Sequence, residues 1–519
     1  MKQRLLALAW AVSLLFVAPH VGYAQLSEGS GATQGLSGAW LTNALTGTVE
    51  GTRDDLPEKG LHHKHVRWVQ RVTNEVGETL DVTNSYVHMQ PGLHYLTTNG
   101  QLAESRPVFE IKDGVAIANR MQFKVRIGGN IASAGYLEVA MPDGRKLRSH
   151  LDALRYFDPV SGQAAIISTV KPTQAYIVGD NQVVFPNAFS NVTADVRYTI
   201  SVAGIEQDVL VHPEAPLPAP EDFGLPSATA RLEVISEFLN PPATLRRSST
   251  NDPSATRVTR GGVLSRLRAE DIDIDFGSMQ IGEGSAFKVG SGTNGPPITV
   301  GKRWLRLNSA GQVAAESETA ARQFLIEAVD VVAVEPVLPG ESTTPGGAML
   351  KRSGNRNVLV QSDFQAIPPL RESSNEEASV RRDPPASLLA ALAGPLLVLD
   401  YVEQLNTGTH NNFTFLSGLT YFISGNHDFT GTTVLEGGAV IKMELWPQNT
   451  TPQHQMVIHG PVVCKTSASL PLIITARDDD TVGAVHASST GTVTYGYGTY
   501  GLYFAWDSPA VELKYIHFA

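Results

Sequence analysis

The chain has 519 residues, including 47 glycines, 31 prolines and one cysteine, and charged residues make up only 18% of it. This composition argues against a coiled coil, collagen and a fully disordered chain, and the length allows about three or four domains. The formal net charge of −11 at pH 7 provides no basic surface, so no nucleic-acid partner is expected.

The first 24 residues have the three parts of a secretory signal peptide. Lys2 and Arg4 give a positive start, residues 5–18 form an apolar core, and residues 22–24 (Gly-Tyr-Ala) suit a signal peptidase. The apolar core is shorter than the ~20 residues that a membrane-spanning helix needs. We therefore expect cleavage near Ala24, a secreted or cell-surface location, and no transmembrane segment after cleavage.

Short stretches of alternating apolar and polar residues fill the segment from residue 66 to residue 212. Residues 107–112, 123–127 and 136–140 are examples, and each is followed closely by Asp-Gly or Gly-Gly. Such alternation is typical of half-buried antiparallel strands, and these dipeptides tolerate the positive φ of tight hairpin turns. The sequence predicts an all-β chain that begins, after residue 36, with an antiparallel β-sandwich-like domain over residues 36–212.

Four further segments follow this domain in the sequence. Residues 213–227 are rich in proline and predict a stiff connector, and residues 228–338 alternate again. The latter are a second β-rich module or a continuation of the first. Residues 339–395 are polar and interrupted by prolines, so we expect a linker there. Residues 396–519 are predicted to be a separate module.

This last module contains short apolar runs that recur at irregular intervals, over residues 420–424, 439–443, 455–459, 472–476 and 512–518. Glycine, asparagine and aspartate separate the runs. Each run is too short to form a stable sheet by itself, so stacking of successive coils is the natural way to satisfy its backbone. We therefore expect parallel strands stacked into a solenoid.

The segments 420–425, 432–442 and 471–483, with strands on either side of Gly437-Gly438, resemble the opening coils of large exported bacterial proteins with right-handed parallel β-helix repeats, the pectate-lyase-like superfold. The resemblance covers about the last 105 residues. It implies that residues 396–519 form the opening coils of a right-handed parallel β-helix. This β-helix is expected to be incomplete at the point where the sequence stops. It also implies polysaccharide lyases, glycoside hydrolases, adhesins or binding proteins without choosing among them.

The sequence stops inside a predicted strand, at Ala519, without a polar capping repeat. A truncated gene product, or a coil end that another chain covers, would explain this pattern. A longer species in an intact-mass measurement on protein from the native host would decide between them.

Candidate chemistry is concentrated in the same module. Asp478, Asp479 and Asp480 are oxygen ligands of the kind that Ca²⁺ prefers, and the implied lyases use Ca²⁺ with a basic residue as proton abstractor. Arg477 and Lys442 are the basic residues nearby. An ordinary Asp-rich turn after residues 472–475 is the competing interpretation, and no cofactor is required by it.

Further carboxylates for a lyase or hydrolase are available at Glu436 and Asp507. Four aromatic side chains in the glycine-spaced segment 494–506 could stack on sugar rings, namely Tyr495, Tyr497, Tyr500 and Trp506. A glycine-rich loop without ligand is the alternative. His62, His63 and His65 are close in sequence, but adjacent side chains point differently, which favours a surface cluster over a zinc site.

Three functions from different classes stay open. The first is an exported multi-domain β protein with a binding, cell-surface or structural role, with polysaccharide or another cell-surface component as partner. The second is a polysaccharide lyase or glycoside hydrolase of the β-helix type. The third is the N-terminal fragment of a larger surface protein. The first is preferred because the sequence contains no nucleophile elbow, no His-Glu-x-x-His motif and no phosphate loop.

Overall fold

The computed structural model describes most of the chain from residue 51 onward. The described ranges are 51–73, 77–212, 217–244, 246–249, 272–276, 279–282, 284–289, 298–315, 318, 320–334, 361–371, 378–393, 396–404, 408–444, 454–493, 501–505 and 508–519. The predicted signal peptide, Asp507 and the four predicted sugar-stacking residues Tyr495, Tyr497, Tyr500 and Trp506 lie outside these ranges.

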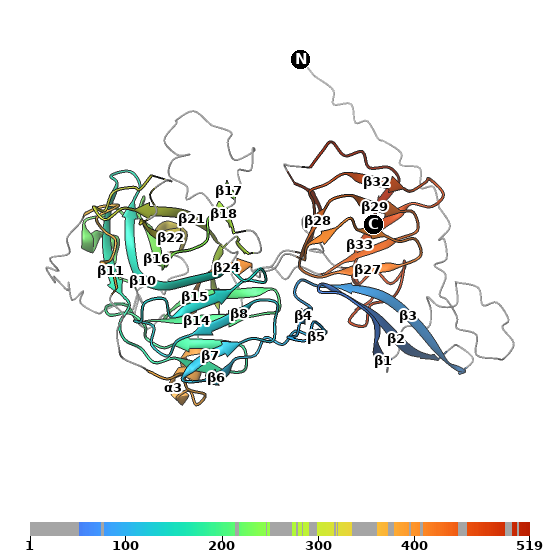
Figure 1. The fold of residues 1–519 in the computed structure, drawn as a ribbon, viewed down its shortest axis with the longest axis horizontal. Helices are drawn as coiled ribbons and strands as arrows, with labels where there is room; N and C mark the ends of the chain where they lie inside the picture. The colour runs from blue at the N-terminus through green and yellow to red at the C-terminus, as the bar shows by residue number, and fades with distance from the viewer. Residues whose placement is uncertain are drawn as a thin grey trace, which may run out of the picture.

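The described chain is all-β, as predicted, and its strands form two separate groups of sheets (Figure 1). Helical segments are short: η1 (Pro220–Phe223), α2 (Val331–Val334) and α3 (Ala386–Ala393). Within the described ranges, no helix has both the length and the apolar character needed to cross a bilayer.

The first group, which we call the antiparallel unit, is a single 16-stranded sheet. Its strands are β6 (Glu110–Lys112), β7 (Val115–Ala118), β8 (Lys124–Ile127), β9 (Leu137–Ala140), β10 (Lys146–Asp158), β11 (Gln163–Thr169), β12 (Tyr176–Val178), β13 (Gln182–Phe185), β14 (Ala194–Ile200), β15 (Gly204–Val211), β16 (Arg231–Phe238), β20 (Gly284–Val289), β21 (Ile298–Leu307), β22 (Arg322–Asp330), β23 (Gln361–Ser362) and β24 (Leu396–Gln404). Strands from both ends of the sheet share one apolar core, in which Val125 and Val209 are both fully buried. A small sheet of β17 (Arg246–Ser249), β18 (Ile272–Asp275) and β19 (Gln280–Ile281) accompanies it.

Strand pairing changes two of the predicted boundaries in this unit. β16 pairs with β10, so the segment 228–338 continues the first sheet and is not a second module. β24 pairs antiparallel with β15 and β20, so the parallel strands do not begin at residue 396. The first four residues of β24 are all buried, and a continuous apolar run of this kind suits an interior strand of either kind of sheet.

The second group, which we call the parallel unit, consists of three ladders of parallel strands. The first ladder contains β25 (His410–Asn411), β28 (Asn426–Thr430), β31 (Gln455–Ile458) and β34 (Leu502–Phe504). The second contains β26 (Thr414–Phe415), β29 (Thr433–Glu436) and β32 (Val462–Lys465). The third contains β27 (Thr420–Ile423), β30 (Val440–Met443), β33 (Leu472–Ala476) and β35 (Ile516–Phe518). The chain visits the ladders repeatedly in this order, and their inward side chains form one apolar core.

The N-terminal strands pair with the parallel unit and not with the antiparallel one. β1 (Gly51–Lys59), β2 (His63–Thr73) and β3 (Thr79–Met89) form antiparallel hairpins, and β4 (His94–Leu96) pairs with β5 (Leu102–Glu104). β3 pairs in parallel with β27, where Val87 is opposite Tyr421 and Met89 is opposite Ile423. Figure 1 shows these blue strands beside the orange and red ones. The predicted domain 36–212 therefore divides: residues 51–89 belong to the sheet of the C-terminal strands.

Met89 tests this division, because its side chain is fully buried in the core of the parallel unit. We expect Met89→Ala to leave a cavity and to cost about 2–5 kcal/mol, and the loss should increase amide exchange in β27 and β30 while β10 and β16 stay protected. Leu96→Ala is the control, because Leu96 is 59% exposed. Unchanged exchange in β27 and β30 of Met89→Ala would contradict the assignment.

Candidate functional site

The outer face of the third ladder carries the charged residues that the sequence singled out. Phe422, Lys442 and Thr475 are opposite one another on β27, β30 and β33. Their neighbours Ile441 and Ile474 point into the apolar core, and because successive side chains alternate, the three residues face outward. This row is the base of the candidate site.

Residues 477–491, which we call the covering segment, fold over this outer face. The His486 ring stacks on the Phe422 ring with 4.0 Å between their centroids. The backbone N–H of Ala484 donates a hydrogen bond of 2.8 Å to Oγ1 of Thr420. The covering segment thus closes the face from which a ligand would approach Lys442.

Lys442 is the most unusual group under the covering segment, because a lysine side chain is seldom completely buried. Its Nζ donates a hydrogen bond of 2.7 Å to the carbonyl oxygen of Asp479. Burial lowers the pKa of Lys442, and the carboxylates of Asp480, Asp479 and Asp478 oppose this shift. The arrangement neutralises a buried cation by surrounding it with acidic groups.

The three aspartates are themselves bound by protein donors. Asp478 accepts from Nη2 of Arg477 at 2.8 Å and from the N–H of Thr490 at 3.0 Å. Asp479 accepts from Oγ1 of Thr475 at 2.6 Å, and Asp480 accepts from Oγ of Ser489 at 2.7 Å.

Hydrogen bonding also sets the charge state of Asp479. Burial raises its pKa, but the hydrogen bonds from Thr475 and Thr481 lower it to below the ordinary value. Asp479 therefore carries its charge at neutral pH. The donors occupy oxygens that Ca²⁺ would need, which favours the Asp-rich turn over the calcium site.

The structure brings together only part of the predicted site. Lys442, Arg477 and Asp478–Asp480 are neighbours, and Arg477 also pairs with Glu444 at 2.5 Å. Glu436 lies on β29, in the second ladder, where it accepts from the N–H of Ser417 at 3.1 Å and from Nζ of Lys465 at 3.4 Å. The sequence missed Glu444 and His486 because no spacing rule connects a residue to its neighbour one coil away.

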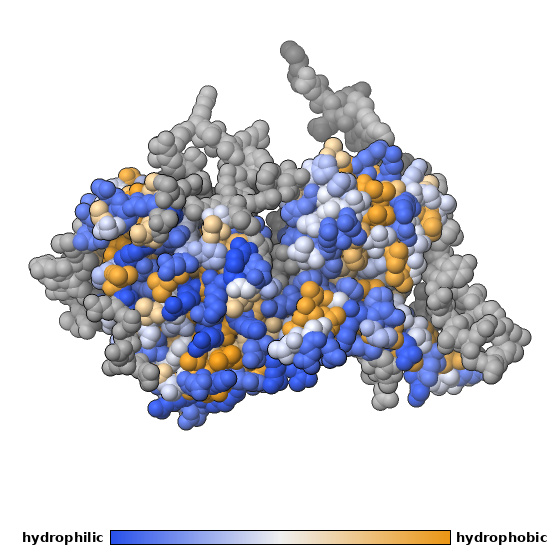
Figure 2. Space-filling view, in the orientation of Figure 1, coloured by the Kyte–Doolittle hydropathy of each residue, from blue (hydrophilic) through white to orange (hydrophobic). Residues whose placement is uncertain are grey.

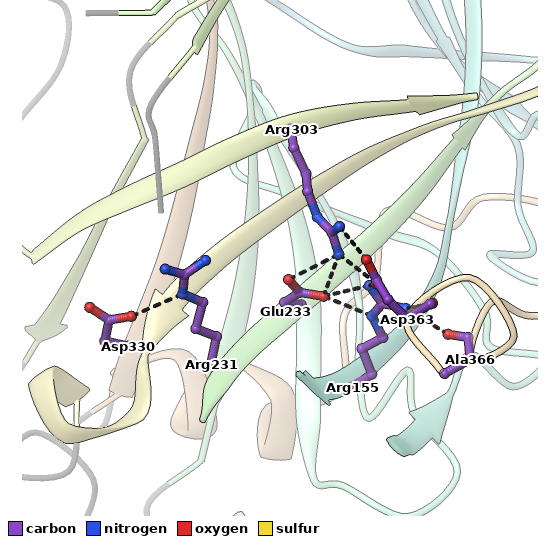
Figure 3. A network of polar contacts seen from close by, with 7 residues as sticks. All are labelled: Arg155, Arg231, Glu233, Arg303, Asp330, Asp363 and Ala366. Atoms are coloured by element: carbon purple, nitrogen blue, oxygen red, sulfur yellow. Dashed lines mark hydrogen bonds and ion pairs between the residues drawn. The ribbon is translucent and has the colours of Figure 1, made fainter. Parts of the chain in front are cut away.

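The antiparallel unit holds a second concentration of charge, which the sequence did not indicate (Figure 3). Arg155 of β10 is completely buried, and its guanidinium bonds to Glu233 of β16 at 2.7 Å and to Asp363 at 2.6 Å. Arg303 of β21 reaches the same two carboxylates, at 3.3 Å and 2.6 Å. Arg155 also donates to the carbonyl oxygens of Asp363 and Ala366. Two cations and two anions therefore balance in this network.

Ionisation within the network follows from these contacts. Burial raises the pKa of Asp363, but Arg303 and Arg155 lower it to below its usual value. Burial lowers the pKa of Arg303, whereas Glu233 and Asp363 raise it by more. Asp363 and Arg303 are consequently charged at neutral pH. The network attaches residues 361–371, which the sequence predicted as part of a linker, to the sheet.

A third cluster attaches the other end of residues 361–371. Nε2 of His150 lies 3.3 Å from Oδ1 of Asp152 and 3.5 Å from Oε2 of Glu237. Arg371 binds Asp152 at 3.0 Å, and Arg322 binds Glu237 at 2.7 Å. Among the described residues, His150, Asp152 and Glu237 are the only three whose possible metal-ligand atoms lie within 4.8 Å of one another.

The hydrogen bond on the opposite side of the His150 ring argues against a metal ion there. Nδ1 of His150 accepts the N–H of Gly135 at 3.2 Å, so in the neutral ring the proton is on Nε2. Nε2 then carries the hydrogen and offers no lone pair to a metal. The two arginines already balance the charges of Asp152 and Glu237, so the cluster is explained as a structural one.

No protein-family model, curated protein or solved structure matches the chain. The resemblance of residues 415–519 to pectate-lyase-like proteins therefore stays a prediction, and the function must be argued from the geometry.

Arg155→Met tests the structural role of the buried network. Removing one cation leaves Glu233 and Asp363 buried with too few partners, which should cost about 3–5 kcal/mol of unfolding free energy in a urea titration. Arg120→Met is the matched control, because Arg120 pairs with Glu110 where both side chains are 50% exposed, and a pair of this kind contributes about 0–1 kcal/mol. Equal losses in the two variants would show that the network does not stabilise the sheet.

Proposed function

We propose that the chain is an exported multi-domain β protein with a binding or structural role at the cell exterior. The observation that carries this proposal is the internal use of the charged groups that were candidates for catalysis. Lys442 binds a backbone carbonyl beneath the covering segment, and Arg477 is held by Glu444 and Asp478. Groups with these partners stabilise the fold and are not poised to transfer protons to a substrate.

The parallel unit is, in this proposal, a right-handed parallel β-helix whose outer faces bind the partner. The repeated order of its three ladders supports the assignment, and solenoids typically bind through such extended surfaces. In Figure 2, hydrophobic residues lie between hydrophilic ones on the face of this unit that is turned to the viewer.

A polysaccharide is the partner that we propose, because the aromatic side chain of Tyr503 is exposed on an outer face. Tyr503 of β34 is 49% exposed and is opposite Val457 of β31, which is in turn opposite Asp428 of β28. Tyr503 and Asp428 are therefore on one face, two strands apart. The aromatic ring can stack on one sugar ring while the carboxylate accepts hydrogen bonds from hydroxyl groups further along a polysaccharide.

The alternative of a polysaccharide lyase has one observation in its favour. Lys442 lies beside three aspartates and burial lowers its pKa, which are properties of a lysine that abstracts protons. The covering segment would have to move before a substrate could reach Nζ. Binding without turnover is therefore preferred.

Glycan-array binding of the secreted protein tests the proposal. We expect Tyr503→Ala to weaken binding by roughly 3- to 10-fold through the loss of ring stacking, and Tyr503→Phe to retain most of it. Val463→Ala is the control, because Val463 is also exposed, at 43%, but lies on β32 of the second ladder.

Two outcomes would overturn the proposal. Binding to no glycan would remove polysaccharide as the partner. Release of unsaturated uronic acid products from a polyuronate, lost in Lys442→Ala, would identify a lyase and contradict a role limited to binding.

A further inference from the structure

Four histidines, two of them buried and two half-buried, lie where the N-terminal hairpins meet the first coils of the parallel unit. We call them the histidine joint: His62 between β1 and β2, His410 on β25, His427 on β28, and His454 directly before β31. Nε2 of His410 lies 3.0 Å from Nδ1 of His427, and the rings of His62 and His410 meet edge to face with centroids 5.9 Å apart. The joint thus connects segments separated by about 350 residues.

The hydrogen bonds of the joint fix where the protons are. Nε2 of His427 lies 3.2 Å from the carbonyl oxygen of Ser424, so it carries a hydrogen and Nδ1 of His427 must accept. His410 therefore donates through Nε2. A doubly protonated His427 would have no acceptor nitrogen for this bond.

Two other members of the joint also accept through a ring nitrogen. Nδ1 of His62 accepts the N–H of Gly92 at 3.1 Å, and Nδ1 of His454 accepts the N–H of Gly425 at 2.7 Å. Protonation of either ring places two N–H groups against each other. Three of the four histidines consequently accept a hydrogen bond through a ring nitrogen that must stay unprotonated for these contacts to persist.

The His427 ring has no space in which to turn away from this conflict. A Cβ on Gly408 would lie 2.5 Å from Nδ1 of His427, so that ring is packed directly on the backbone. His427 is completely buried and His410 is 8% exposed. A proton that enters the joint therefore strains the contact between the two segments.

The surroundings offer little negative charge to a protonated joint. His427 faces Asp428 and His62, and Asp428 already contacts Nε2 of His459 at 3.1 Å. The titratable groups that face His410 are other histidines, and burial lowers the pKa of His454. His63 and His94 lie near the joint. His65 is close to His63, and the charged groups close to His94 are Lys59, Lys64 and Glu104.

Burial lowers the pKa of His410 to about 2, of His427 to about 3, and of His62 and His454 to about 4, with neighbouring histidines adding to the shift for the first three. In the open state these groups return to about 6.5. A group whose pKa is lower in the closed state takes up protons on opening. Its contribution to the stability of the closed state is therefore complete above pH 6.5, and it is lost as the pH falls towards the closed-state pKa.

We propose that the histidine joint is an acid-sensitive latch, which releases the N-terminal hairpins from the parallel unit as the pH falls below about 6. Release separates β3 from β27 and withdraws Val87 and Met89 from the core of the parallel unit. It leaves β27 as a free edge strand that can pair with another extended chain. An exported protein that enters an acidic environment would in this way change the surface that it presents.

Pulsed amide exchange on the full chain, corrected for the intrinsic effect of pH, tests the latch. The opening constant of residues 80–89 and 420–423 should rise by up to about tenfold per pH unit for each titrating histidine. Residues 231–238 of β16 are the reference within the same molecule. Opening of both regions together at every pH would overturn the proposal.

Asparagine variants separate the latch from general acid denaturation. Asn places an acceptor oxygen near the position of Nδ1 but does not take up a proton, so His62→Asn and His454→Asn should each reduce the opening gained between pH 7 and pH 5 by roughly 20-fold. His517→Asn is the control, because His517 is exposed on β35 and should leave the profile unchanged.

A variant can already have a higher opening constant than the unsubstituted protein at pH 7. The test is then the slope of the opening constant against pH, and not its value at pH 7. A reduced slope in His62→Asn or His454→Asn supports the latch whatever the starting value. A slope equal to that of the unsubstituted protein in both variants would contradict it.

Discussion

A stack of parallel strands has a first strand with no neighbour on one side, and in this molecule β3 occupies that place beside β27. The pairing satisfies the outer backbone groups of β27, while Val87 and Met89 cover the end of the apolar core. Without this contact the first coil would present an open sheet edge and exposed hydrophobic side chains, which invite aggregation. The N-terminal hairpins are therefore the cap of the parallel unit.

This cap determines how the rest of the chain is organised. Because residues 51–89 and 408–519 make one sheet-based unit, the 16-stranded sheet between them is an insertion whose two ends leave from the same neighbourhood. Several buried or half-buried charged groups hold returning segments in place. Arg155 and Arg371 attach residues 361–371 to the sheet, and Lys442 anchors the covering segment.

Local pattern predicted the kind of structure but not its long-range pairing. The alternation in residues 107–140 and the short runs after residue 415 correspond to strands, and the runs at 420–424, 439–443 and 472–476 pair in parallel. Of the two alternatives for residues 228–338, the structure shows the continuation of the first sheet, and the predicted start of the parallel module at residue 396 was wrong. Nothing in β3 or β24 distinguishes a strand that pairs with its sequence neighbour from one that pairs with a strand about 200 to 330 residues away.

The candidate site shows the same division. The sequence indicated Asp478–Asp480 with Lys442 and Arg477, which are neighbours in space, because β30 and β33 are adjacent in one ladder. It grouped Glu436 with them, although β29 belongs to a different ladder. The sequence indicated only one member of the histidine joint, because His62 stands close to other histidines in the chain. His410 and His427 approach His62 only because the N-terminal hairpins pair with the parallel unit.

Cross-linking of Asn84 to Val485 is the most direct measurement of the cap, because Oδ1 of Asn84 lies 3.5 Å from the backbone nitrogen of Val485, 401 residues away. The cysteine pair Asn84→Cys with Val485→Cys, in a Cys464→Ala background, should react rapidly with a short bifunctional thiol reagent and give an intramolecular product of altered gel mobility. The control pair Asn84→Cys with Val160→Cys, at an exposed site of the antiparallel unit, should not. If the first pair reacts no faster than the control pair, the N-terminal hairpins do not cap the parallel unit.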